Sequence, residues 1–292
     1  MRPKIVIAYD GTSEADDGLV LGRLLAELRD AELLVARVLP ESDSTEATQR
    51  AMQHWFRATL GETREAAASL LGDRPFELWP VFGMPVAAGI DALAADQGAE
   101  LIVFGSPQHG RLARLLLGNA ASAACEGAPC AVAVAPDRYR RRRHVSPPVI
   151  GVAYDGSAEA SAALDAGVAL ARAGSLPLRV IAVEPRGLSR PIRRPAADAP
   201  DLERLPVALA DLEVETRRYD GDPAGILARE SERLGLLVLG SRARGPLRRV
   251  MLGSVSSAVL RSAACPVVVV PRRVLHPTEA APERLAAALS RH

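Results

Sequence analysis

Two short segments whose residue types could do chemistry each occur twice in this sequence of 292 residues. One is an Asp-Gly pair that ends an apolar run, at Asp10 and at Asp155. The other is a Gly-Ser pair followed thirteen residues later by a further glycine, and it begins at Gly105 and at Gly240. Such glycines let a phosphate group approach backbone N–H groups, and a helix that begins beside them adds positive potential. The glycine segments therefore predict an anion site in each copy.

The second glycine segment carries the richer chemistry. It runs from Leu239 to Ser257 and contains the sequence Gly253-Ser254-Val255-Ser256. We expect Gly253 to open a helix whose first N–H groups have no acceptor within the helix. Together with the hydroxyl groups of Ser254 and Ser256, these N–H groups would form a site for an anion.

These segments belong to an internal repeat that covers nearly the whole chain. The two aspartates are 145 residues apart, whereas the glycine segments are 135 residues apart, so the second copy is shorter between them. A stretch with five arginines that ends in prolines separates the copies and reads as a linker. We predict a first domain at 1–137, the linker at 138–147, a second domain at 148–272 and a C-terminal tail helix at 273–292.

Short apolar runs alternate with helical patterns in each copy. Runs such as Leu236–Leu239 and Val267–Val270 are apolar on both faces, as expected for parallel strands covered by helices. Strands are predicted at 4–9, 32–38, 76–81, 100–104 and 130–135, and again at 148–154, 177–183, 214–219, 236–239 and 266–270. Helices are predicted at 14–29, 84–97, 158–173 and 223–234, with a longer one within 41–72 and a loop at 186–200. The predicted fold is α/β, with two doubly wound five-stranded parallel-sheet domains.

The composition excludes several classes of protein. With 48% hydrophobic residues, 24% charged residues and a net charge of +1, the chain is neither a disordered tail nor a strongly basic nucleic-acid binder. No run approaches the roughly 18 apolar residues of a membrane span, and the N-terminus has no secretory pattern. The three cysteines fit neither a disulfide framework nor a zinc site, and Cys130 and Cys265 read as buried thiols. We expect a cytoplasmic protein with no nucleic acid or membrane as a partner.

The segment from Leu239 to Ser257 resembles the universal stress protein pattern G-x2-G-x9-G-[ST], and the family's strand-one aspartate precedes it. The resemblance implies a Rossmann-like fold, similar to adenine nucleotide alpha hydrolases, that binds ATP with Mg²⁺. Asp155 would lie near the phosphates and hold the metal indirectly, Ala153 and Tyr154 would lie beside the nucleoside, and the Val183 backbone would hold the adenine edge. The implied lining of the ribose and phosphates comprises Leu239, Gly240, Arg242, Ala243, Gly253, Ser254, Val255 and Ser256.

The second copy departs from the pattern at Ala243, which stands where the second glycine is expected. A methyl group there would crowd the ribose or disfavour a left-handed backbone by about 1 kcal/mol. Arg242 and Arg244 could offset this by contacting phosphate.

The first copy departs further. Gln108 replaces the second glycine, Pro107 removes a donor, and Asn119 and Ala121 replace two hydroxyl residues. The residues that remain for a weaker first site are Asp10, Val38, Gly105, Gly118 and Asn119. We therefore predict that the second copy is the better nucleotide site.

Simpler structural interpretations compete with these functional ones. The two Asp-Gly pairs could be strand-ending turns that cap the next helix, and Asn119 and Ser254 could be ordinary N-caps. Taken alone, the glycines could simply be loop residues with no ligand. The arginine run at 138–143 is best explained as a solvated linker, although nucleic acid or lipid headgroups are alternatives.

Three functions remain open. The first is an ATP-binding regulatory protein of the stress response. We expect no enzyme in this case, because no general base with a positioned nucleophile is evident in the sequence. Any hydrolysis of ATP would therefore be slow. The second is a nucleotide-free interaction module. The third is an enzyme related to adenine-nucleotide α-hydrolases or electron-transfer flavoproteins, but the chain lacks their loop after strand one, and it also lacks a Walker loop. The expected partners are ATP, an unidentified protein, and the other copy in a pseudo-dimer through 130–135 and 266–270, with a further homodimer possible.

Overall fold

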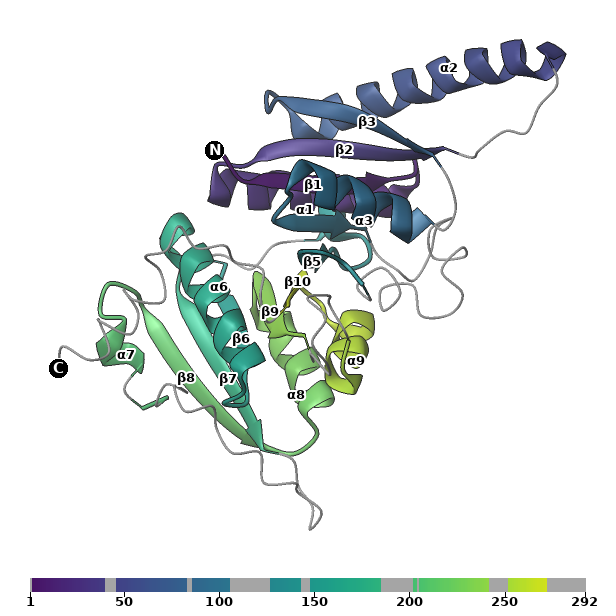
Figure 1. Ribbon diagram of the computed structural model, residues 1–292. Coiled ribbons are helices and arrows are strands. Elements are labelled where there is room, and N and C mark those ends of the chain that lie inside the picture. The colour runs from purple at the N-terminus through teal and green to yellow at the C-terminus, as the bar shows by residue number, and fades with distance from the viewer. Residues whose placement is uncertain are drawn as a thin grey trace. The chain divides into compact units, whose positions relative to one another are not determined.

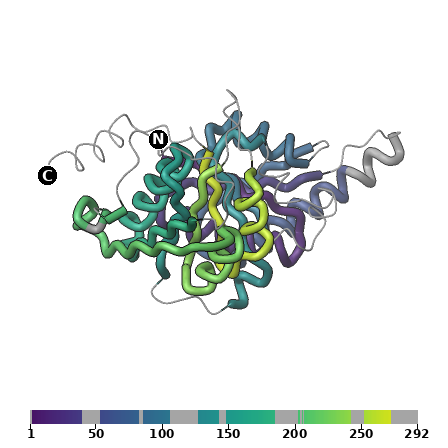
Figure 2. Tube along the Cα trace, turned by 90° about the horizontal axis from the view of Figure 1, so that it is seen from below, coloured from purple at the N-terminus to yellow at the C-terminus, as the bar shows by residue number. Residues whose placement is uncertain are grey.

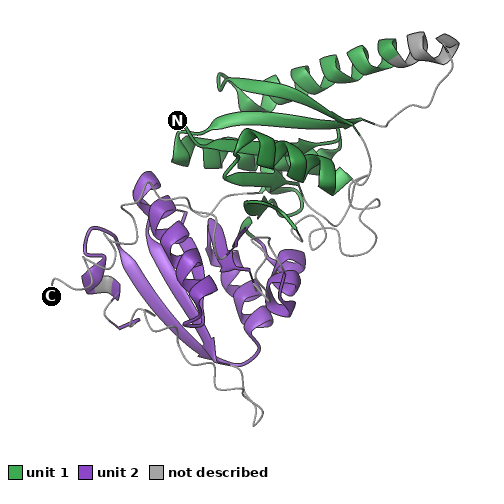
Figure 3. Cartoon of the chain, viewed as in Figure 1, with its two compact units in different colours: residues 1–143, 265–267 green, residues 144–264, 268–292 purple. Residues whose placement is uncertain are grey.

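The chain divides into two compact units, which Figure 3 distinguishes by colour. The first comprises residues 1–143 with 265–267, and the second comprises 144–264 and 268–292. The computed structural model describes residues 2–39, 46–82, 86–105, 127–142, 148–184, 202–203, 205–241 and 252–271. Each unit contains a parallel sheet with helices, so the predicted α/β fold class is confirmed.

The sheet of the first unit has the strand order β3-β2-β1-β4-β5. Its strands are β1 (Lys4–Tyr9), β2 (Glu32–Leu39), β3 (Phe76–Phe82), β4 (Leu101–Phe104) and β5 (Ala131–Val134). Its helices are α1 (Ser13–Arg29), α2 (Glu46–Leu71), α3 (Val86–Gln97) and the short 3₁₀ helix η1 (Tyr139–Arg141). Figure 1 and Figure 2 both show α2 running beyond the end of its own sheet.

The second unit repeats this order as β8-β7-β6-β9, with β10 beside β9. Its strands are β6 (Ile150–Tyr154), β7 (Leu178–Glu184), β8 (Val214–Asp220), β9 (Leu236–Gly240) and β10 (Val267–Val270). Its helices are α6 (Ala158–Gly174), α7 (Leu205–Ala208), α8 (Pro223–Glu230), the 3₁₀ helix η2 (Ser231–Arg233) and α9 (Ser254–Ser262). In both units the first strand in sequence pairs with the second and fourth.

The ten predicted strands are all present, with bounds that agree within two residues. The helix predicted at 223–234 is shorter in the structure, because α8 ends at Glu230 and the chain continues as the 3₁₀ helix η2. At this junction the Ser231 hydroxyl donates to the Ala228 carbonyl. The predicted loop at 186–200 and tail helix at 273–292 lie outside the described residues. In the part of the chain that the structure describes, no helix combines the length and apolar character needed to cross a bilayer.

The helices that follow β1 and β6 begin in the same way. Thr12 caps α1 by accepting a hydrogen bond from the Ala15 N–H, and Ser157 caps α6 by accepting one from Ala160. Both helices end at a residue in the left-handed conformation, Asp30 and Ser175. Each of these caps satisfies backbone groups that a helix terminus leaves without a partner.

Each of these helices packs directly on a glycine at the carboxyl end of the fourth strand. A Cβ atom on Gly105 would lie 1.8 Å from the Glu14 carbonyl oxygen in the first turn of α1. A Cβ atom on Gly240 would lie 2.5 Å from the Glu159 carbonyl oxygen in α6. Because backbone atoms cannot move aside as a flexible side chain can, both positions require glycine for packing alone, whatever else they do.

Alanine at these two positions should therefore destabilise the protein. We expect Gly105→Ala and Gly240→Ala each to lower the free energy of unfolding by about 2 kcal/mol or more, because the added methyl group overlaps backbone. Gly61 in α2 is the matched control, since a Cβ atom there meets nothing within 4 Å, and Gly61→Ala should raise that free energy by about 0.5–1 kcal/mol. Urea denaturation measures all three, and an equal effect at Gly61 and Gly240 would contradict the packing argument.

Asp165 on α6 should make stability depend on pH. Burial raises the pKa of this carboxyl group to about 6, because it disfavours the charged form. The folded pKa therefore lies above the unfolded pKa of about 4, and the free energy of unfolding falls as pH rises between these two values. Asp165→Asn cannot ionise, so the melting temperature of this variant should rise relative to wild type as pH increases from about 4 to about 7. Parallel melting curves across that range would contradict this cause.

Candidate functional site

Three strands of the second unit end together at the carboxyl edge of the sheet. The register pairs Tyr154 with Ala182 and Val152 with Val238. At the strand ends, Asp155 of the central β6 therefore lies between Val183 on β7 and Gly240 on β9. Ligands of doubly wound sheets bind outside this edge. Three residues of the predicted second site are thus brought together from β6, β7 and β9.

Asp155 is exposed and holds its own turn. Its Oδ1 accepts a hydrogen bond from the Ser157 N–H at 3.0 Å and another from the Ser157 hydroxyl at 2.5 Å. Asp10 does the same in the first unit, where Oδ1 accepts from the Thr12 N–H at 3.0 Å and from its hydroxyl at 2.6 Å. Both aspartates therefore form a turn after their strand, as in the simpler structural interpretation. The same hydrogen bonds hold each carboxylate at the carboxyl edge of its sheet.

Tyr154 and Ala153 differ in what they offer to a ligand. The Tyr154 side chain is only 6% exposed and packs in the core, where burial raises the pKa of its hydroxyl group. Its backbone, rather than its ring, is therefore the part available at the edge. Ala153 and Val183 are both partly exposed.

The helix α9 begins at this edge, as predicted. Gly253 is its N-cap and has no side chain to satisfy the first N–H groups, so the alternative interpretation of Ser254 as the N-cap is wrong. Ser254 is the first helical residue and is exposed. Ser256 is buried, and its hydroxyl donates to the Gly240 carbonyl at 3.4 Å, which joins the start of α9 to the end of β9. Val255 lies between them and is partly exposed.

The rest of the loop is only partly described. Leu239 is buried, and the buried Ser241 N–H donates to the Val270 carbonyl at 2.8 Å. Several predicted site residues lie outside the described residues, namely Arg242 and Ala243 of the second copy and Gln108, Gly118 and Asn119 of the first.

The described residues of the first unit form the same arrangement at the carboxyl edge of its sheet. Tyr9 pairs with Arg37, and Val38 pairs with Val81, so Asp10 and Val38 stand at the same edge as Gly105. The Arg37 guanidinium carbon lies 5.8 Å from the centre of the buried Tyr9 ring. The second copy has Ala182 in place of this arginine, so the two edges differ in charge.

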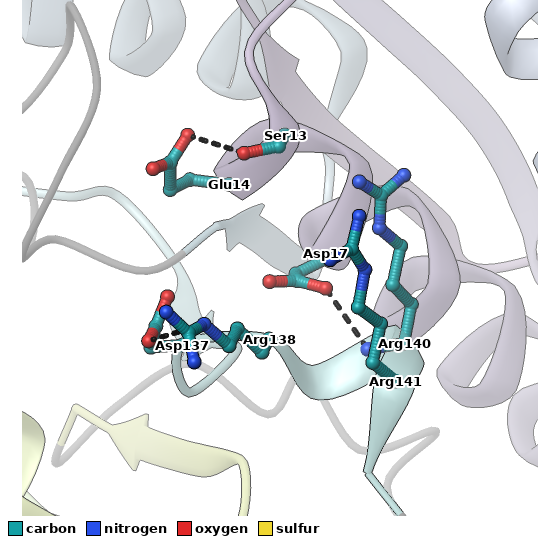
Figure 4. A pocket seen from close by; sticks show the side chains of 7 residues that line it. All are labelled: Ser13, Glu14, Asp17, Asp137, Arg138, Arg140 and Arg141. Atoms are coloured by element: carbon teal, nitrogen blue, oxygen red, sulfur yellow. Dashed lines mark hydrogen bonds and ion pairs between the residues drawn. The ribbon is translucent and has the colours of Figure 1, made fainter.

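A polar cavity of about 360 Å³ in the first unit was not predicted from the sequence. It is lined by Ser13, Glu14, Asp17, Asp137, Arg138, Arg140 and Arg141, as Figure 4 shows. The sequence feature that could have indicated this cavity is the Asp16-Asp17 pair, because the second copy has Ser161-Ala162 at the same positions. None of the predicted site residues lines this cavity.

One wall of the cavity is the arginine run that the sequence presents as a solvated linker. The Arg140 N–H donates to Asp17 Oδ1 at 2.9 Å, its guanidinium pairs with Asp16, and the Tyr139 side chain is buried. Burial raises the pKa of the Asp17 carboxyl group, although the N–H groups of η1 lower it in part. Arg140 is therefore held against α1 by two aspartates, whereas Arg138, Arg141 and Arg142 are exposed, as expected for a solvated segment.

The cysteines agree with the sequence analysis where they are described. Cys130 and Cys265 are buried free thiols, and burial raises the pKa of each to about 12, so they are not reactive thiolates. Within the described ranges, no group of three or more His, Cys, Asp or Glu side chains is placed to hold a metal ion.

Comparison with known proteins assigns the family. Residues 1–136 and 148–271 each match the profile of the Universal stress protein family. The chain belongs to the universal stress protein family. A universal stress protein of Mycobacterium tuberculosis is 29% identical over 289 residues, which cover 91% of this chain and 96% of the relative. One from Mycolicibacterium smegmatis is 25% identical over 290 residues, with the same coverage of 91% and 96%.

Solved universal stress proteins share the fold of this one. A crystal structure from Archaeoglobus fulgidus matches with a TM-score of 0.69 at 18% identity, covering 94% of this chain and 98% of the other. A putative universal stress protein from Pseudomonas aeruginosa matches with a TM-score of 0.60 at 17% identity, covering 98% and 97%. Another universal stress protein, crystallised in complex with cAMP, covers 39% of this chain and 84% of its own length, with a TM-score of 0.31 at 23% identity.

The contact between η1 and α1 in this universal stress protein can be tested by proteolysis. Asp17→Ala removes the acceptor of the Arg140 N–H, so trypsin should cut after the arginines of 138–142 several-fold faster than in wild type. Glu27→Gln is the control, because it breaks only an exposed ion pair with Arg23 on the same helix and should leave the rate unchanged. Peptide mapping by mass spectrometry identifies the cut sites. Equal rates for both variants would mean that Asp17 does not hold this segment.

Proposed function

We propose that this universal stress protein binds ATP with Mg²⁺ in its second domain and acts as a nucleotide-dependent regulatory protein in the cytoplasm. The observation that carries the proposal is the start of α9. Gly253 caps this helix without a side chain, and Ser256 joins it to Gly240 at the edge that also carries Asp155. The uncapped N–H groups of a helix of nine residues are donors that suit a phosphate group.

The remaining residues of the edge suit the other parts of a nucleotide. Asp155 is exposed beside this helix start and would hold the metal ion indirectly, near the phosphates. Val183 is partly exposed at the end of β7, where its backbone would hold the adenine edge. The bound Mg²⁺ would neutralise phosphate charge, and the chain would supply orientation through its strand ends.

We propose no catalytic step for this site. Asp155 already accepts two hydrogen bonds that hold its own turn, so it is poorly placed to take a proton from water. Any hydrolysis of ATP should therefore be slow, and the protein would act through partner contacts that differ between its nucleotide-bound and nucleotide-free forms.

A nucleotide-free interaction module is the second candidate, and an aromatic cluster on the first unit favours it. Trp55 is 42% exposed and Phe82 is 51% exposed, and both lie against Phe56 with ring centres 5.3 and 5.6 Å apart. Exposed aromatic groups of this kind are typical of protein interfaces. Ala243 and Gln108, which replace pattern glycines, also favour this candidate.

Two tandem domains of this family also fit an intramolecular pseudo-dimer. We propose that they pair through 130–135 and 266–270, since the last strand of each domain would otherwise be an open edge. A homodimer of the whole chain would be a further level of assembly.

The nucleotide content of freshly purified protein, followed by calorimetric titration with ATP in the presence and absence of Mg²⁺, tests the function. We expect bound ATP and Mg²⁺-dependent heat in wild type. Asp155→Ala with Gly253→Val should abolish both, because the variant loses the carboxylate and blocks the helix start. The matched variant of the first copy, Asp10→Ala with Gly118→Val, should retain them.

Two results would contradict the proposal in different ways. Absence of nucleotide and of heat in wild type would favour the interaction module. Loss of binding only in the first-copy variant would mean that the two sites are ranked wrongly.

A further inference from the structure

The polar cavity of the first unit is separate from the proposed nucleotide site. No described residue of either predicted ATP site lines it. Its volume of about 360 Å³ is at the lower end of the range for ligand pockets, roughly 300–1,000 Å³. The described lining is polar or charged throughout and comprises Ser13, Glu14, Asp17, Asp137, Arg138, Arg140 and Arg141. A cavity of this kind suits a small polar ligand rather than an apolar one.

The lining carries positive and negative charges in balance. Three of the described lining residues are arginines and three are carboxylates. A ligand with one sign of charge would be attracted by one set and repelled by the other at similar strength. A ligand that carries both signs at separate atoms is attracted by both sets. The balance of charge therefore favours a zwitterion over a plain anion or cation.

Most of these charges are already paired, and the pairs hold the walls of the cavity. Asp17 accepts the Arg140 N–H at 2.9 Å, and the Arg140 guanidinium pairs with Asp16, which lies outside the lining. Asp137 Oδ2 lies 3.6 Å from Arg138 Nε. These contacts fix η1 against the start of α1 and use up two lining residues of each sign.

Glu14 and Arg141 are the remaining lining charges, and neither has an ion-pair partner among the described residues. Glu14 is in the first turn of α1, where its carboxylate accepts a hydrogen bond from the Ser13 hydroxyl at 3.1 Å. Arg141 is the last residue of η1, and its side chain is exposed. Figure 4 shows Ser13 and Glu14 on one side of the cavity and Arg141 on the other, with Asp17 between them in this view. The cavity therefore presents one negative and one positive group to a ligand, from two different elements.

The backbone beside the cavity is strained. Arg138 has a φ of 57°, in the left-handed region. This conformation is unfavourable for a residue with a side chain, and such strain is concentrated at functional sites. The turn at Arg138 leads into η1, so that Arg138, Arg140 and Arg141 all line the cavity. A role for these side chains in binding would explain why arginine rather than glycine occupies the strained position.

The second copy lacks the residues that form this cavity. Ala158 and Ala162 stand where the first copy has Ser13 and Asp17, and Leu275 stands where it has Arg140. The cavity is therefore a property of the first copy and does not follow from the shared fold.

We propose that this cavity binds a small zwitterion that has an ammonium group at one end and a carboxylate group at the other. The ammonium group contacts the Glu14 carboxylate and Ser13 Oγ, and the carboxylate group contacts the Arg141 guanidinium through charge-assisted hydrogen bonds. The bound molecule joins α1 to η1. This site is additional to the proposed ATP site and does not depend on it.

The experiment titrates the isotopically labelled full chain with γ-aminobutyrate and follows the backbone amide signals by NMR. Butyrate lacks the ammonium group and butylamine lacks the carboxylate group, and both have the same number of carbon atoms as the probe. We expect γ-aminobutyrate to shift the amide signals of 13–17 and 138–141 to saturation. Each single-charge analogue should bind about threefold more weakly, which is the size expected for the loss of one exposed ion pair.

Two variants assign the two charges of the ligand to their partners. In Glu14→Gln, which keeps the size of the side chain, γ-aminobutyrate should bind no better than butyrate. In Arg141→Gln, γ-aminobutyrate should bind no better than butylamine. Arg23→Ala is the control, because Arg23 is an exposed arginine of α1 that does not line the cavity, and this variant should keep the preference of wild type for γ-aminobutyrate.

Three results would overturn the inference. The first is that butyrate binds wild type as tightly as γ-aminobutyrate, which would indicate a plain anion site. The second is that the preference for γ-aminobutyrate survives in Glu14→Gln and in Arg141→Gln. The third is that γ-aminobutyrate causes no saturable shift at 13–17 and 138–141. None of these results affects the proposed function, which the ATP titration tests separately.

Discussion

The contact between the fourth strand and the helix after the first strand is the constraint on which each edge depends. At Gly105 and Gly240 the backbone of the strand meets the backbone of the helix, with no room for a methyl group. In the first unit the helix side of the contact is also glycine, since a Cβ atom on Gly18 would lie 2.9 Å from the Gly105 nitrogen. This close approach fixes the helix start, and with it the Asp-Gly turn, relative to the end of the fourth strand.

The same glycines and aspartates that the sequence predicts as site residues also serve the packing and turns of the fold. Asp155 uses Oδ1 to hold the turn that leads into α6, and Gly240 admits α6 while its carbonyl accepts from Ser256. A site built from groups that the fold itself requires is held in place before any ligand arrives.

The two units have the same strand order but differ in the groups placed around it. The first has Asp16 and Asp17, which hold η1 and the arginines that line its cavity, and it has the exposed Trp55 and Phe82. The second has Ser161 and Ala162 at the corresponding positions of α6. The two units thus share one strand order and carry different side chains around it.

The sequence by itself determined the repeat, the ten strands and the family, because apolar runs and glycine spacing are local patterns that survive in the linear order. It also indicated that Gly253 opens a helix. Only the tertiary structure decided that Gly253 rather than Ser254 is the N-cap and that Arg140 is held against α1. The second of these facts depends on residues that are distant in sequence, Asp17 and Arg140, and no local pattern encodes which acceptor a distant N–H group will meet.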